Sequence, residues 1–165
     1  MHAFTKVCDY QSMKLPGNTD GAPLNTYSRL FLSAGGITAF TSVAMGALGT
    51  HAIQNTISPA YLLIYQTAVQ YHFYHALGLL ALGVTAIFIT DSRLLILSGV
   101  LMIAGILLFS GSLYVISLTG TNGLGLLTPF GGAALLGSWA LYSAAVIRHP
   151  RQRDGILNPN KVSGD

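Results

Sequence analysis

One run of polar and aromatic residues organises the chain: Tyr65-Gln66-Thr67-Ala68-Val69-Gln70-Tyr71-His72-Phe73-Tyr74-His75. It leads directly into the apolar segment 76–90, which predicts that the run opens a membrane-spanning helix. Histidines, amides and phenols are costly in lipid unless protein or water satisfies their hydrogen bonds. The run is therefore the main candidate for a functional site.

The composition around this run is that of an integral membrane protein. Of the 165 residues, 52% are hydrophobic and only 8% are charged, whereas a soluble domain carries roughly a quarter charged residues. No charged residue occurs in 30–90 or in 94–147. Each of these blocks is long enough for two crossings of about 20 residues. The sequence predicts an all-α, integral membrane four-helix bundle.

Charged and turn-forming residues divide the chain into three regions. We expect a mobile polar N-terminal tail at 1–28, a transmembrane domain at 29–149, and a polar, basic C-terminal tail at 150–165. Within the domain, helices are expected at about 30–50, 62–90, 94–118 and 128–147. Helix N-caps are predicted at Ser58, Asp91 and Thr128, because such side chains accept bonds from free backbone amides.

Small residues at helical spacing predict where helices approach closely in lipid, since packing drives association there. The first helix carries Gly35, Ala39, Ser42, Gly46 and Gly49. The third carries Ser98, Gly105 and Ser112, and the fourth carries Ala133, Gly137, Ala140 and Ala144. We interpret each set as a packing seam.

The basic residues predict the orientation. With four crossings, both tails and the 91–93 connection share one side, which holds all 8 Lys and Arg residues, while the opposite loops hold none. The positive-inside rule then predicts both termini in the cytoplasm, or in the matrix of a mitochondrion. The protein is expected in a bacterial inner (plasma) membrane, or in the mitochondrial inner membrane of a eukaryote. Because the cations lie at helix ends, no nucleic-acid partner is expected.

Depth within the membrane brings the polar motifs together. Counting about 20 residues along each predicted helix from its charged end places the polar motifs of all four helices in the same layer, near the membrane surface opposite the basic residues. At 100° per residue, Tyr71, His75 and Gly78 share a face, and His72 lies toward a neighbouring one, so we favour His75. The candidate pocket consists of His51, Gln66, Gln70, Tyr71, His75, Ser110, Ser112, Tyr114, Thr128, Pro129 and Gly132. The alternative is structural: hydrogen bonds between helices, an aromatic belt and close packing.

Four motifs in 30–148 resemble the YgdD/YwdK family of small inner-membrane proteins of unknown function. The motifs are Gly46-Ala47-Leu48-Gly49-Thr50-His51-Ala52, Gln66-Thr67-Ala68-Val69-Gln70-Tyr71 with His75-Ala76-Leu77, Leu108-Phe109-Ser110-Gly111-Ser112-Leu113-Tyr114, and Thr128-Pro129-Phe130-Gly131-Gly132 with Gly137 and Trp139. The resemblance implies a four-helix membrane protein and supplies no activity. His72 stands where the resemblance leads us to expect another polar residue, often glutamine.

We expect a non-enzymatic protein, without catalytic residues, bound metal or cofactor, because its predicted helices contain no Asp or Glu. Its pocket would hold a lipid, a quinone or a partner helix, and the protein could serve as an accessory subunit of a larger membrane complex or form a homo-oligomer. One alternative is a haem or metal protein that uses His51 with His72 or His75. Another is a small transporter, although membrane charges and broken helices are missing from the pattern.

Overall fold

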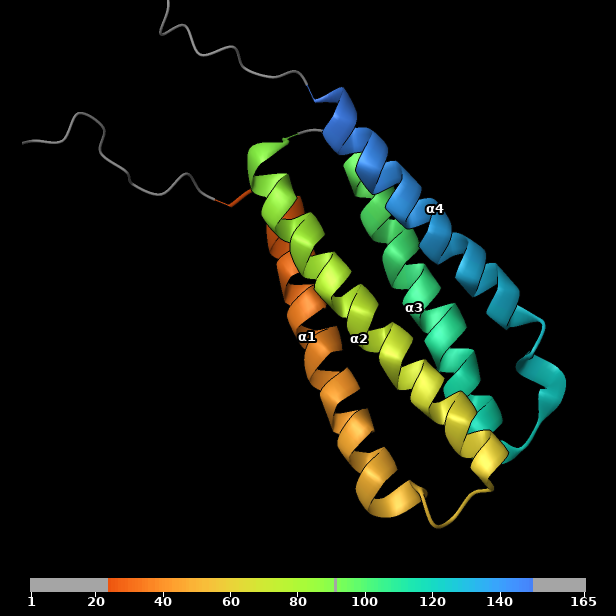
Figure 1. The fold of residues 1–165 in the computed structure, drawn as a ribbon. Helices are drawn as coiled ribbons and strands as arrows, with labels where there is room; N and C mark the ends of the chain where they lie inside the picture. The colour runs from red at the N-terminus through yellow and green to blue at the C-terminus, as the bar shows by residue number, and fades with distance from the viewer. Residues whose placement is uncertain (1–23, 91, 150–165) are drawn as a thin grey trace, which may run out of the picture.

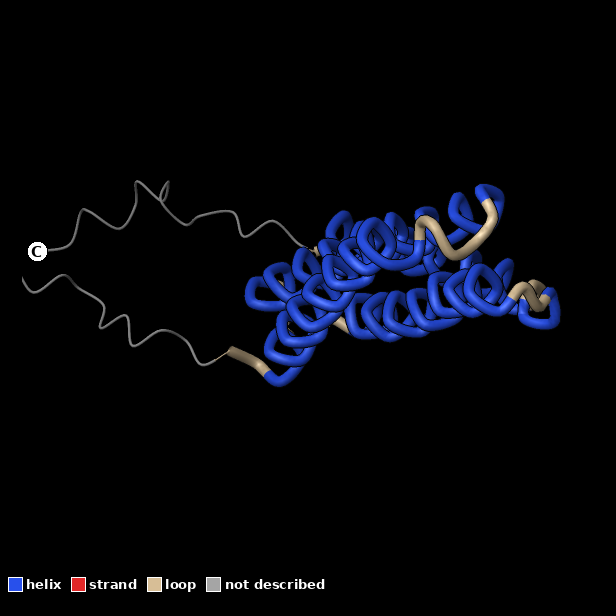
Figure 2. Tube along the Cα trace, turned by 90° about the horizontal axis from the view of Figure 1, so that it is seen from below, coloured by secondary structure: helices blue, strands red, loops and turns tan. Residues whose placement is uncertain are grey.

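The computed structural model describes residues 24–90 and 92–149, and these ranges contain helices and short connections but no strand (Figures 1 and 2). The helices are α1 (Thr26–Leu48), a π-helix η2 that continues it (Gly49–Ile53), α2 (Pro59–Phe88), α3 (Arg93–Thr119), a 3₁₀ turn η3 (Asn122–Leu124) and α4 (Leu127–Arg148). The predicted tails lie outside the described residues, except for 24–28, where α1 begins.

The four long helices are each long and apolar enough to span a membrane, which confirms the predicted all-α class with four candidate spans among the described residues. Helix α4 has 22 residues, or roughly 33 Å at 1.5 Å per residue, close to the hydrocarbon thickness of about 30 Å. Helix α2 has 30 residues. It is therefore longer than one crossing requires.

Helices that follow one another in the sequence pack together in space. Helix α1 packs on α2, α2 on α3, and α3 on α4 (Figure 1). Of the most apolar segment of each helix, 39% is buried in α2 and in α3, but only 17% in α1 and 22% in α4. Helices α2 and α3 therefore form the centre, and α1 and α4 turn most of their surface outward.

Small residues make the contact between α1 and α2. Gly35, Ser42 and Gly49 are buried. A Cβ on Gly35 would come within 2.9 Å of the backbone nitrogen of Leu80, and one on Gly49 within 2.7 Å of the Tyr65 ring. Such close approach requires glycine, so the seam predicted for the first helix is confirmed at these positions.

The small residues of α3 face α4. Ser98 and Ser138 each donate a hydrogen bond to the other's backbone carbonyl, at 2.8 and 2.7 Å. The Leu135 side chain occupies the space beside Gly105, where a Cβ would come within 2.5 Å of it. Ser112, the third member of the predicted stripe, is also buried. The seam predicted for the third helix is confirmed.

The seam predicted for the fourth helix is wrong at two of its four positions, while Gly137 and Ala144 are half-buried. Ala133 and Ala140 are exposed. The buried positions of α4 are instead Gly131, Leu135, Ser138 and Ala145. Because α3 already contributes small residues to this contact, α4 supplies the larger Leu135 to fill the space. Close approach falls to Gly131, which lies directly against the backbone of Phe109.

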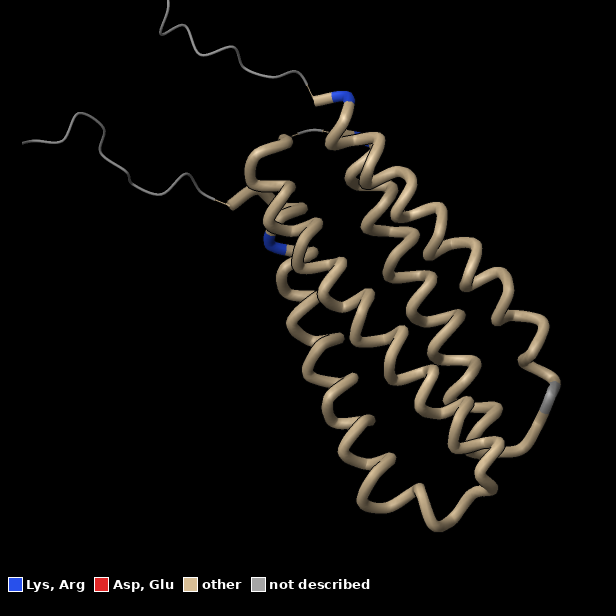
Figure 3. The backbone as a smooth tube through the Cα atoms, viewed as in Figure 1, with Lys and Arg blue, Asp and Glu red and all other residues tan. Residues whose placement is uncertain are grey.

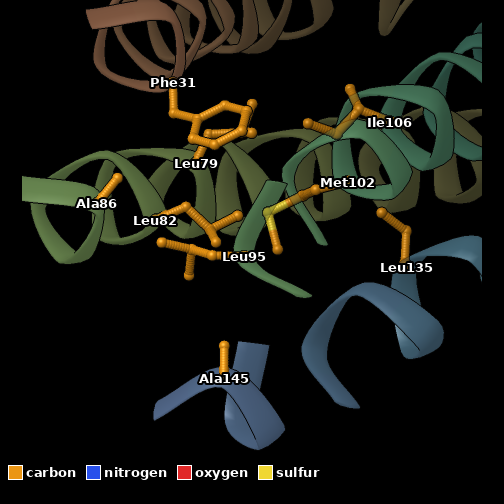
Figure 4. Packing of buried hydrophobic residues seen from close by; sticks show 9 residues of the cluster. All are labelled: Phe31, Leu79, Leu82, Ala86, Leu95, Met102, Ile106, Leu135 and Ala145. Atoms are coloured by element: carbon orange, nitrogen blue, oxygen red, sulfur yellow. The ribbon is translucent and has the colours of Figure 1, made fainter. Parts of the chain in front are cut away.

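A hydrophobic core connects all four helices (Figure 4). Its buried members are Phe31, Leu79, Leu82, Ala86, Leu95, Met102, Ile106, Leu135 and Ala145. The Phe31 ring lies across Leu79 and fills the space beside Gly99, where a Cβ would collide with it. Helix α1 thereby reaches α3, although its main partner is α2.

Serines cap the central helices. Ser58 accepts a hydrogen bond from the Tyr61 amide, which confirms the predicted N-cap of α2. Asp91, predicted to cap the third helix, lies outside the described residues. Ser92 caps α3 by accepting from the Leu95 amide. The polar residues before these helices therefore satisfy amides that no helical carbonyl reaches.

The predicted cap at Thr128 is wrong. Helix α4 begins at Leu127, and no side chain caps it. The Thr128 hydroxyl instead lies 2.8 Å from the Ser112 hydroxyl on α3. Thr128 therefore joins two helices, because its position one residue inside α4 turns its side chain toward the neighbouring helix.

The π-helix η2 forms where Tyr65 inserts its side chain beside α1. The Tyr65 hydroxyl donates to the Met45 carbonyl at 2.7 Å, and its ring lies against Gly49. The Gln54 amide then reaches back five residues to the Gly49 carbonyl. This five-residue bond widens the last turn at the end of α1.

Candidate functional site

One set of inward residues of α2 recurs at alternating steps of three and four. It consists of Tyr65, Ala68, His72, His75, Leu79, Leu82 and Ala86. All are buried except His72, which is half-buried. Because this spacing is that of a heptad seam, both histidines belong to the packed side of the helix.

His72 connects three helices. Its Nε2 lies 3.4 Å from Thr41 Oγ1 on α1, and its Nδ1 lies 3.4 Å from the Tyr114 hydroxyl on α3. The Tyr114 ring packs edge-on against Tyr65, with ring centroids 5.3 Å apart, and Tyr65 donates to the Met45 carbonyl. Both ring nitrogens of His72 therefore face protein partners, and we assign this histidine to helix packing.

His75 lies next to His72 along this seam, on the side of α4. Its Nδ1 lies 2.7 Å from the Tyr71 carbonyl, one turn earlier on the same helix. The Tyr71 ring stacks on the imidazole at a centroid distance of 5.9 Å, and Trp139 of α4 lies at 6.3 Å. Phe109 of α3 extends this cluster, because its ring lies 4.6 Å from Tyr71. Three helices thus surround one imidazole with aromatic rings.

A cavity of about 210 Å³ lies beside this cluster, and we name it the α2–α4 cavity. Its lining consists of Tyr71, His75, Phe109, Gly132, Leu135, Leu136 and Trp139. Leu136 is 74% exposed, Tyr71 40% and Trp139 38%, whereas His75 is only 7% exposed. The cavity therefore opens to the outside of the bundle at membrane depth and has the imidazole on its inner wall.

Two larger cavities adjoin the α1–α2 seam near its η2 end. Their volumes are about 470 and 550 Å³, and Gly46, Thr50, Val69 and Gln70 line both. Gln66 lines the first and His51 the second. Both of these side chains and Gln70 are exposed. These residues therefore lie apart from the α2–α4 cavity, on the side of α2 that faces α1.

The remaining candidates are distributed between the interior and the surface of the bundle. Ser112 and Thr128 bond each other, and Tyr114 belongs to the His72 network. The Ser110 hydroxyl is buried and has no hydrogen-bond partner among the described residues. Pro129 lies exposed in the first turn of α4. Of the eleven candidates, the structure brings Tyr71, His75 and Gly132 together around the α2–α4 cavity.

Phe109 and Trp139 also line this cavity, although the sequence analysis did not select them for the site. Trp139 follows Ser138 of the α4 seam, and Phe109 precedes Ser110. A correct seam for α4 would have turned Trp139 toward α2. Its position depends on Gly78, where a Cβ would come within 3.1 Å of the indole.

Within residues 24–90 and 92–149, no three His, Cys, Asp or Glu side chains are grouped so that they could hold a metal ion. His51 and His75 line different cavities. His72 faces Thr41 and Tyr114 instead of a second histidine. The histidine-ligated alternative therefore gains no supporting observation.

Comparisons with known proteins give a consistent result. The family described as "Protein of unknown function (DUF423)" matches residues 45–132. The UPF0382 membrane protein YwdK of Bacillus subtilis is 40% identical over 121 residues, which cover 73% of this chain and 98% of that protein. The UPF0382 inner membrane protein YgdD of Escherichia coli is 35% identical over 128 residues, which cover 76% and 95%. No solved structure matches the chain significantly.

Proposed function

The chain belongs to the DUF423 (UPF0382) family of multi-pass membrane proteins, and from that premise we propose that it binds a lipid-soluble, ring-bearing ligand in the α2–α4 cavity without catalysing a reaction. The protein is integral to the inner (plasma) membrane and so has the bilayer as its surroundings. Such a ligand, for example a quinone, would reach the cavity from the surrounding lipid.

The observation that carries the proposal is the lining of the cavity. Aromatic side chains pack well against the edges and faces of other rings, and the α2–α4 cavity offers three of them. The His75 imidazole stands among them on the inner wall. Mostly apolar walls with a small number of placed polar groups are typical of small-molecule sites.

The non-enzymatic part of the proposal is supported by charge. Described residues 24–90 and 92–149 contain no Asp or Glu. Acid–base and nucleophilic mechanisms commonly use a carboxylate to activate or orient a histidine. The nearest polar neighbour of His75 is a backbone carbonyl, which positions the ring but does not exchange protons.

The orientation is also a proposal. The described basic residues near helix ends, Arg29, Arg93 and Arg148, lie toward one end of the bundle (Figure 3). The connections at 54–58 and 120–126, at the other end, contain no Lys or Arg. This asymmetry supports cytoplasmic termini, which would place the α2–α4 cavity in the outer half of the membrane.

Gentle-detergent purification followed by native mass spectrometry and lipid extraction tests the proposal. The matched variants are Gly132→Val and Gly137→Val, since Gly132 lines the cavity and Gly137 lies outside it on the same helix. A Cβ would have ordinary contacts at either position, 3.6 Å from Phe109 or 3.7 Å from Leu101. The same spectra report any self-association or partner subunit.

We expect the wild-type protein and Gly137→Val to retain a ring-bearing lipid. Gly132→Val adds an isopropyl group to the cavity wall, and overpacking costs about 1–3 kcal/mol, so the substitution should lower the affinity for this lipid about tenfold or more. A wild-type sample that carries only bulk membrane lipid, or equal occupancy in both variants, would contradict the proposal.

A further inference from the structure

We infer that the α2–α4 cavity selects ligands whose ring carries a hydroxyl group, such as a phenol or the reduced hydroquinone form of a quinone, because His75 Nε2 can only accept a hydrogen bond there. This inference rests on the proposed function and specifies the ligand class of the same site. Its basis is the hydrogen bond that the histidine makes to its own helix.

The position of the ring proton follows from the partner of Nδ1. Nδ1 lies 2.7 Å from the Tyr71 carbonyl oxygen, and a carbonyl oxygen can only accept. Nδ1 must therefore carry the hydrogen. In a neutral imidazole the other nitrogen, Nε2, then has a free lone pair.

The surroundings favour the neutral ring. His75 is 7% exposed, and its ring neighbours, Tyr71 and Trp139, are uncharged. No carboxylate occurs in the described parts of the chain, so a buried imidazolium would have no counter-ion. A buried charge without a partner is strongly unfavourable. Nε2 is thus an acceptor.

No protein donor is recorded for Nε2 within the described residues, whereas Nδ1 has its carbonyl. A ligand hydroxyl in the α2–α4 cavity would supply the missing donor. A ligand without one, such as the oxidised quinone or an aryl ether, would cover the lone pair and leave it unsatisfied. An unsatisfied buried acceptor costs about 1–3 kcal/mol, which corresponds to a preference of roughly tenfold or more for the hydroxyl form.

The chain contains its own reporter for the test. It has 1 tryptophan, and this residue, Trp139, lines the cavity. Fluorescence titration of the full-length protein in detergent would compare a long-chain alkylphenol with its O-methyl ether. These probes differ only in the hydrogen-bond donor and its methyl replacement, and neither needs to be oxidised or reduced.

We expect the wild-type protein to bind the phenol about tenfold more tightly than the ether. His75→Leu should bring the two affinities together, because it removes the acceptor. Gly132→Val should weaken the binding of both probes alike and leave the ratio of their affinities unchanged. Nitrogen-15 chemical shifts of the wild-type His75 ring give a second readout that needs no variant. They should show a protonated Nδ1 and an Nε2 signal that moves when the phenol binds.

The outcomes separate the inference from the proposed function. Equal binding of phenol and ether by the wild-type protein, with both weakened by Gly132→Val, would overturn the inference and leave the ligand site standing. An unprotonated Nδ1 would also overturn it. Binding that is insensitive to Gly132→Val would overturn the proposed function itself, and the inference with it.

Discussion

At the scale of single residues, the two histidines of α2 differ in the neighbours that their rings contact. His72 lies between Thr41 and Tyr114, on the side of α1 and α3, whereas His75 borders a cavity. Helical spacing predicts Tyr71 and His75 on one face, and both line the cavity. It also predicts His72 toward a neighbouring face, and His72 is half-buried there, whereas His75 is buried. A helix with neighbours on several sides buries more than one face, and sequence spacing alone does not reveal how many neighbours it has.

The network around His72 gives a prediction about relative bond strengths. Tyr65→Phe removes a 2.7 Å bond to a backbone carbonyl, whereas Tyr114→Phe removes a 3.4 Å contact with His72. Hydrogen bonds between membrane helices are worth about 0.6 kcal/mol on average and up to about 1.7. We expect Tyr65→Phe to lower the free energy of unfolding by an amount near the upper value, and Tyr114→Phe to lower it by the mean or less. Unfolding in mixed micelles measures both losses. A larger loss for Tyr114→Phe would show that His72 depends on that contact.

At the scale of helices, the number of spans could be predicted because charges are so costly in lipid that their absence marks each block. The seams of α1 and α3 could be predicted because glycine and serine serve close approach there. The seam of α4 could not. Alanine suits both lipid and a helix contact, so only the shape of α3 decides that Leu135 faces inward and Ala133 outward.

Two adjacent glycines test the contact between α3 and α4. A Cβ on Gly131 would collide with the Phe109 backbone, while one on Gly132 would lie 3.6 Å from the Phe109 ring. Gly131→Ala should therefore destabilise the protein by about 1–3 kcal/mol, since backbone must move. Gly132→Ala should leave the free energy of unfolding nearly unchanged. Equal effects in a thermal or detergent unfolding assay would contradict this packing.

The contact between α1 and α3 predicts a compensating pair of substitutions. Gly99→Ala introduces a Cβ where the Phe31 ring lies and should destabilise the protein. Phe31→Leu removes the ring and should cost stability by itself, because it opens space in the core. Together the two should cost less than the sum of their separate effects. An additive double-mutant cycle would argue against direct contact.

At the scale of the whole molecule, the distribution of arginines predicts which loops face outward. After Cys8→Ser removes the single cysteine, new cysteines at Gly123 and at Thr90 report opposite ends of the bundle, and both positions are exposed. A membrane-impermeant maleimide added to intact cells should label Gly123→Cys and leave Thr90→Cys unlabelled until the cells are opened. Labelling in the reverse order would invert the proposed orientation and move the α2–α4 cavity to the cytoplasmic half.

The order in which the helices pack also bears on how the protein is made. Helix α2 packs on α1, α3 on α2 and α4 on α3, so each later helix contacts the one synthesised just before it, and chains generally fold from the N-terminus during translation. A nascent span that leaves the translocon therefore meets its docking surface already waiting in the bilayer. The helices can therefore pack in the order in which they are inserted. No newly inserted helix has to remain unpaired until a distant segment emerges from the ribosome.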